Sequence, residues 1–265
     1  MLKKTTISHR GLLRPISRRS HLEKPTRRPY ISTASTQTSH QRVRNIAFNH
    51  QLPRKMSSFS NADTGDKPSG PYYEKNIDRD VSLKEKVEIL IKFVSSCKFG
   101  MMTTRDPSNG KLVSRCMAVA GKEGGDIDLA FTTNTESHKT DELNADRHTN
   151  ISFYDNSGQW ASIAGEASIE TDREVVKKYY SPTLKAWMGD LGDGVHDGSE
   201  NDPRIAVLKV KTSSITYAIT DKTVMGRVAE IAKGTVTGEP AGINKLREIS
   251  ESEVQQWRAT ASRQA

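Results

Sequence analysis

Between residues 99 and 169, apolar and polar residues alternate in five short runs, which are separated by turn residues and one short helical segment. Alternation with a period of two predicts strands that bury one face. Five strands with a single short helix among them favour an antiparallel meander that closes on itself over a parallel α/β sheet. We therefore expect a mainly β fold, an antiparallel β-barrel with flanking helices. The predicted strands cover residues 99–104, 112–120, 127–133, 151–154 and 160–169.

Helices are predicted on both sides of these strands. Ser82 and Glu85 form a capping box in front of an apolar stripe at helical spacing, and residues 171–174 form a second capping box. Residues 204–220 predict a final long or bent strand, and the tail predicts a helix through Trp257.

Two groups of candidate metal ligands do not form a site in the sequence. Residues 189–203 contain five acidic side chains, but their spacing fits no calcium loop, so a solvent-exposed loop without metal is expected. Cys97 and Cys116 lack metal-ligand spacing and cannot form a disulfide framework. They predict small buried side chains in a reducing compartment.

The formal net charge of +8 is unevenly distributed along the chain. Residues 1–55 hold 13 Lys and Arg against the single Glu23, which gives 13 − 1 = +12, and the remainder carries 27 − 31 = −4. This leader is rich in Arg, Ser and Thr, a composition typical of a mitochondrial transit peptide. If translation instead starts at Met56, a cytoplasmic protein is expected. Nucleic-acid binding is not predicted, because no aromatic residues interleave with the basic ones.

Composition and pattern together divide the chain into four expected regions. These are a basic leader over 1–55 that is disordered or a transit peptide, a linker over 56–79, a barrel over 80–220, and a C-terminal extension with a helix over 221–265. No run of about 18 apolar residues occurs, so no membrane span is expected.

The segment from Phe131 to Leu143 changes from a strand pattern to hydroxyl residues and a lysine where a helix should begin. The first turn of a helix carries unpaired N–H groups and the positive end of the helix dipole. Ser137 as N-cap and Lys139 in the first turn therefore predict a site for an anion such as phosphate.

Arg115 adds to this prediction. Strand alternation places it in an apolar row with Val113, Met117 and Val119. A guanidinium stays charged and is costly to bury unpaired, so this position requires an anion. Two alternatives remain open, a carboxylate of this chain or the phosphate of a ligand.

The order of these residues resembles a known family. Arg115 stands on the second strand, Phe131-Thr132-Thr133 closes the third, and Ser137-His138-Lys139 opens the helix, as in the FMN-binding split-barrel superfamily of pyridoxamine phosphate oxidase. The wider pattern, including residues 160–165 and 185–188, resembles its general stress protein branch. The resemblance implies a homodimer of split β-barrels with FMN between the subunits. Whether FAD is also accepted stays open in the sequence.

The resemblance also implies cofactor contacts for individual residues. It assigns phosphate contacts to Arg115, Ser137 and Lys139, and contacts along the ribityl chain and ring edge to Thr132 and Thr133.

Three further residues have two readings each. His138 stands where members of the family often have a second basic residue, or it is a surface histidine. Trp160 and Trp187 are expected to flank the flavin ring, or to make core or dimer contacts.

Three hypotheses for function follow. The first is an FMN-binding protein of the general stress type that acts as an oxidoreductase on an unidentified small substrate, with no catalytic residue that the sequence identifies. The second is a flavin reservoir or sensor without turnover. The third is an interaction module in which Arg115 is only salt-bridged. The tail does not reproduce the basic segment with which the vitamin oxidase holds its substrate, and no Gly-x-Gly-x-x-Gly fingerprint indicates a nicotinamide-binding domain.

Overall fold

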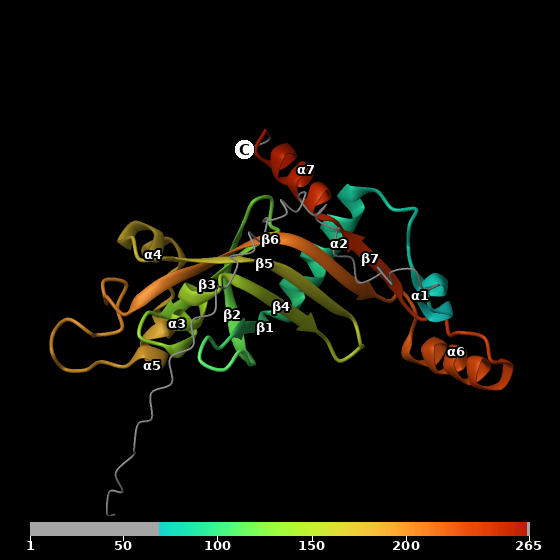
Figure 1. Cartoon of the computed structure of the whole chain (residues 1–265), viewed down its shortest axis with the longest axis horizontal. Coiled ribbons are helices and arrows are strands. Elements are labelled where there is room, and N and C mark those ends of the chain that lie inside the picture. Colours follow the sequence, from blue (N-terminus) through green and yellow to red (C-terminus); the bar gives the residue numbers. More distant parts are fainter. Residues whose placement is uncertain (1–68, 264–265) are drawn as a thin grey trace, which may run out of the picture. The chain divides into compact units, whose positions relative to one another are not determined.

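The structure, a computed structural model, describes residues 69–263; the predicted basic leader and the linker up to residue 68 lie outside them. None of the helices in this described part is both long and apolar enough to cross a membrane. The elements, in chain order (Figure 1), are α1 (Pro71–Asn76), α2 (Leu83–Cys97), β1 (Phe99–Arg105), β2 (Leu112–Glu123), β3 (Asp128–Asn134), α3 (His138–Ala145), β4 (His148–Tyr154), β5 (Trp160–Glu170), α4 (Arg173–Tyr179), a 3-10 turn (Pro182–Leu184), α5 (Lys185–Met188), β6 (Ile205–Ile219), α6 (Val224–Thr237), β7 (Lys245–Ile249) and α7 (Glu251–Ala261).

Six of the strands close into a barrel. Their hydrogen-bonded order is β3-β2-β1-β4-β5-β6, and the pairing of β3 with β6 completes the ring. All neighbours are antiparallel, and β7 extends the sheet beyond β6. The mainly β barrel with flanking helices that the strand pattern predicted is confirmed.

β6 holds the barrel and the additional strand together. Its 15 residues form one continuous strand, in agreement with the prediction of a long or bent strand. Residues 205–210 pair with β3, and residues 215–219 pair with β7. The register between β5 and β6 shifts at Gly165, where an added Cβ would lie 2.4 Å from the carbonyl oxygen of Lys211. This close approach of two backbones requires glycine.

The core of the barrel is filled from one side by α2. Val87, Leu90 and Phe93 of this helix are buried in the same hydrophobic cluster as the inward side chains of the strands. The helix begins as predicted, because the Ser82 hydroxyl accepts a hydrogen bond of 3.2 Å from the Glu85 amide.

Some expectations were wrong in detail. The N-cap of α4 is Asp172, whose carboxylate accepts from the backbone amides of Glu174 and Val175. The cap therefore lies one residue later than predicted. Cys116 is exposed on the outer side of β2, not buried. The sequence pattern did not predict α6 or β7.

Candidate anion site at the start of helix α3

The connection between β3 and α3 is fixed by one carbonyl oxygen. The backbone oxygen of Asn134 accepts from the Ser137 hydroxyl at 2.7 Å and from the Thr140 hydroxyl at 3.0 Å. The Thr135 amide donates to the carbonyl oxygen of Arg204 at 2.8 Å, which ties the turn to the start of β6. Ser137 occupies the N-cap position, but its side chain makes no capping bond. The start of α3 is therefore held in place without its first turn being capped by this hydroxyl.

Lys139 lies almost entirely inside the protein, with 6% of its surface exposed. Its ammonium group donates to the Thr133 hydroxyl and, at 3.1 Å, to the Ser137 hydroxyl. It takes part in no ion pair within residues 69–263. Burial first, and then the neighbouring charge of Arg115, lower the pKa of Lys139 to about 8. A buried cation whose direct partners are hydroxyl groups is only partly compensated.

Arg115 points from β2 toward α3 and has a carboxylate partner. Its Nη2 donates to Glu142 Oε1 at 2.7 Å, and its Nη1 donates to the Thr104 hydroxyl at 2.8 Å. Glu142 is 0% exposed, and its second oxygen accepts from Thr104 at 2.5 Å. The bond from Arg115 holds the pKa of Glu142 below its usual range. The sequence left two partners open for Arg115, a carboxylate of this chain or a ligand phosphate, and the structure provides the carboxylate of Glu142. The Arg115 side chain is still 27% exposed.

The two cations and the carboxylate form one electrostatic unit. Arg115 is close enough to lower the pKa of Lys139, and Glu142 raises it. With both cations charged, the group has one positive charge in excess, so its chemistry fits an anion that offers several acceptor oxygens, such as a phosphate. We call this group the cradle and define it by Thr104, Arg115, Thr133, Ser137, Lys139 and Glu142.

The other predicted site residues lie outside the cradle. Thr132 pairs with Val207, and strand alternation turns its side chain to the face opposite that of Thr133. His138 is 70% exposed, with Nδ1 3.8 Å from Asp141.

The two predicted tryptophans also lie elsewhere. Trp160 is half-buried at the start of β5, opposite Tyr154. Trp187 is 86% exposed in α5. Neither tryptophan is among the residues that form the cradle.

Sequence reasoning missed Glu142 and Thr104. Glu142 follows Lys139 by three residues, which places both on one face of α3. Thr104 lies on the inward face of β1, two residues after Met102, which pairs with Arg115. A carboxylate one helical turn after the lysine was the available signal for Glu142.

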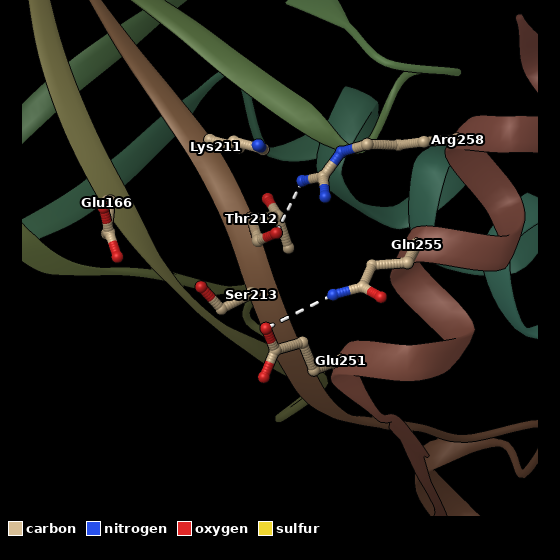
Figure 2. Close-up of a pocket in the computed structure, with 7 residues that line it drawn as sticks. All are labelled: Glu166, Lys211, Thr212, Ser213, Glu251, Gln255 and Arg258. Carbon is tan, nitrogen blue, oxygen red and sulfur yellow. Dashed lines mark hydrogen bonds between the residues drawn. The ribbon is translucent and has the colours of Figure 1, made fainter.

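Two cavities occur elsewhere in the described chain. Figure 2 shows one of about 320 Å³ between β6 and α7, where Arg258 donates to the carbonyl oxygen of Thr212 at 2.5 Å. A wider groove of about 1110 Å³ shares Glu166, Ser213, Glu251 and Gln255 with it. No cradle residue lines either of them.

The comparison with known proteins shows the family to which this chain belongs. The chain is a member of the family described as pyridoxamine 5'-phosphate oxidase like, which matches residues 85–241. It is similar to Protein bli-3 of Neurospora crassa, with 58% identity over 203 residues that cover 76% of this chain and 97% of the relative.

Solved structures are similar to this chain at low sequence identity. A putative general stress protein 26 from Jannaschia sp. is 21% identical, with a TM-score of 0.48, and the match covers 63% of this chain and 99% of that one. A pyridoxamine 5'-phosphate oxidase-related, FMN binding protein from Nostoc punctiforme is 13% identical, with a TM-score of 0.42, over 53% of this chain and 85% of that one.

Proposed function

We propose that this chain is an FMN-binding protein of the general stress type, in which the cradle holds the phosphate of the cofactor. The observation that carries the proposal is Lys139, a nearly buried ammonium group whose direct partners are two hydroxyls. The salt bridge between Arg115 and Glu142 accounts for one cation of the cradle and leaves the other in excess. A phosphate would supply the missing negative charge, and membership of the family supports the assignment.

The residues of the cradle would each make a different contact with FMN. Lys139 and the exposed part of Arg115 would donate charge-assisted hydrogen bonds to the phosphate, each with a contribution of about 1.5–3 kcal/mol. Ser137 would add a hydroxyl at the start of α3. The bound flavin supplies the hydride or electron chemistry, while these side chains bind and orient it.

The remaining predicted contacts stay part of the proposal. Thr132 and Thr133 would lie along the ribityl chain and ring edge, and His138 would approach as a second basic group. Trp160 and Trp187 would flank the ring once a second copy of the chain completes the site.

Substitution of Lys139 tests the phosphate assignment. Lys139→Ala should weaken FMN binding by at least about tenfold, because it removes a charge-assisted hydrogen bond, and should leave riboflavin binding unchanged. Fluorescence titration with both flavins measures the two affinities. Lys111→Ala, at an exposed lysine outside the cradle, is the matched control. Equal losses for FMN and riboflavin would place the phosphate elsewhere.

We also propose that the protein is a homodimer that associates through the outer side of its barrel. Strand register brings outward side chains of β2, β1, β4 and β5 into one surface, in which Arg105, His148 and Glu166 lie in a single row at one end, beside Leu112. The rest of this surface has no charged residue. We call it the outer face, and it consists of Phe99, Met101, Thr103, Leu112, Ser114, Cys116, Ala118, Ala120, Asn150, Ser152, Tyr154, Trp160, Ser162 and Ala164.

The polar groups of the outer face satisfy one another. Thr103 bonds with Ser114 at 2.8 Å, and Asn150 donates to Ser162 at 2.8 Å. Phe99 and Tyr154 are exposed large aromatic side chains on the same surface. A contiguous surface without charge and with few free polar groups is suited to burial against another protein surface.

The oxidoreductase and the flavin reservoir differ in turnover. Anaerobic mixing of the FMN-loaded protein with NADH or NADPH distinguishes them, since bleaching of the flavin absorbance at a catalytically useful rate requires an electron-accepting enzyme. Flavin that stays oxidised supports the reservoir or sensor.

A further inference from the structure

Helix α6 contacts its own chain with its polar side. The helix has 14 residues and buries none of them. Its half-buried positions, Gly226, Arg227, Glu230 and Gly234, lie on one side at helical spacing. Arg227 donates to the carbonyl oxygen of Ser157, and Glu230 accepts from Lys222 at 2.8 Å.

The apolar side of α6 faces away from the described chain. Five large apolar side chains of this helix are each more than half exposed, namely Val224, Met225, Val228, Ile231 and Val236. An isolated helix of this length with two internal glycines is marginal in water, and most helical stability comes from packing of an apolar face. The arrangement is the reverse of a normal surface helix, and it indicates that another surface covers the apolar side.

The chemistry of α6 favours a protein surface over a membrane. Helices that lie on membranes are rich in Lys and Arg and carry Trp or Phe on the apolar side. α6 has only Arg227 and Lys233 as basic residues and no aromatic residue, and both of these make contacts within the chain. Its outward side needs a partner surface that is apolar and uncharged.

The outer face is such a surface, and it begins beside α6. Arg227 attaches the helix to the turn between β4 and β5, and the outer face ends at the same turn with Tyr154 and Trp160. Figure 1 shows α6 beyond the end of β6, separate from the layer of barrel strands. Helix α6 is therefore attached beside one border of the uncharged surface, with its apolar side chains exposed.

The area of the outer face alone is small for a stable dimer. Four strands about 4.8 Å apart and about 23 Å long give roughly 450 Å², against about 800 Å² per partner in a typical stable interface. The outward side of α6 adds roughly 200 Å², from a helix about 21 Å long and about 10 Å wide. Together they give roughly 650 Å² per partner, which is closer to the area of a typical stable interface than the outer face alone.

We propose that α6 is a dimer arm, whose apolar side packs reciprocally on the border of the outer face of a second copy of this chain. The inference rests on the homodimer of the proposed function, and it adds the element that completes the interface.

The variant Val228→Asp, Ile231→Asp tests the arm in the full chain. Light scattering coupled to size-exclusion chromatography should show a wild-type dimer. The variant should raise the dimer dissociation constant at least about 100-fold, because the reciprocal interface would bury four new charges in each dimer. Both residues are exposed in a single chain, so circular dichroism should show an unchanged fold. The matched control, Gln256→Asp, Thr260→Asp, adds the same charge to exposed positions of α7 and should leave the dimer intact.

A photo-crosslinking amino acid at position 228 gives a second, independent readout. Irradiation should yield a product of twice the chain mass, with crosslinks that map to the partner. A variant that dimerises as tightly as wild type, or crosslinks confined to one chain, would overturn the arm. The arm would also be overturned if the wild type were monomeric and sedimented with phosphatidylcholine–phosphatidylserine vesicles while the α6 variant did not. That result would show that α6 binds a membrane surface. Failure of the wild type to bind FMN in titration, by contrast, would reject the flavin proposal and leave the dimer arm to its own result.

Discussion

At the scale of single residues, Lys139 places a positive charge where solvent hardly reaches it. Its pKa falls from 10.5 to about 8, so the folded chain binds this proton more weakly than the unfolded chain does. The protonated lysine therefore destabilises the fold, and this cost is fully present below pH 8. It disappears as the pH rises from about 8 to about 10.5. A residue that lowers stability is expected where function requires it.

Removal of that charge should stabilise the flavin-free protein. We expect Lys139→Met to raise the free energy of unfolding at pH 7 by about 1–3 kcal/mol. The substitution removes the energetic cost of the lowered pKa, and the loss of two hydrogen bonds offsets part of this gain. At pH 10 the gain should be much smaller, because the wild-type lysine is then neutral in the folded state. Urea unfolding of both proteins at the two pH values measures the difference. A gain that is equal at both would show that charge is not the cause.

Only part of the cradle could be predicted from residues alone. Arg115 and Lys139 were found because a cation in an apolar row and a lysine at a helix start each require an anion. The partner of Arg115 stayed open between a carboxylate and a ligand, since Glu142 is 27 residues away and meets it only when α3 packs on the barrel. Strand alternation predicts which way Arg115 points, but not which carboxylate it meets.

At the scale of elements, strands and helices with strong periodicity were predicted well. α2 and β1 to β6 appear where alternation or helical spacing placed them. α6 was missed because Gly226 and Gly234 lower its helix propensity and its apolar residues contact nothing in the described chain. β7 has five residues, too few for periodicity to distinguish a strand, and its place depends on the free edge of β6.

The register shift at Gly165 gives a prediction for β5. Gly165→Ala should destabilise the fold by about 1–3 kcal/mol, because its Cβ would be forced against the Lys211 carbonyl oxygen and two paired backbones would have to separate. Thermal unfolding measures the change. Gly70→Ala is the matched control, since an added Cβ there meets no atom within 4 Å. An unchanged melting temperature for the Gly165 variant would mean that the strands separate at no cost.

At the scale of the whole molecule, charge and its absence divide the chain. The net charge of +8 arises from residues 1–55, and the remainder is mildly acidic. Against that charged background the outer face stands out, because strand register joins its uncharged residues from four strands. Sequence alternation identifies the outward residues of each strand, but only the register shows that they form one surface. The cradle shares no residue with either of the two cavities described above.

If the flavin lies between two copies, its binding and dimerisation must strengthen each other by the same factor. We expect saturating FMN to lower the dimer dissociation constant by at least about tenfold, a coupling of about 1.4 kcal/mol. Lys139→Ala should largely remove this effect at equal FMN concentration, because the phosphate is then held weakly. Sedimentation velocity over a dilution series, with and without FMN, measures the constant. FMN that binds at full affinity and leaves the constant unchanged would contradict a site between two copies, because a ligand that contacts both subunits binds the dimer more tightly than the monomer.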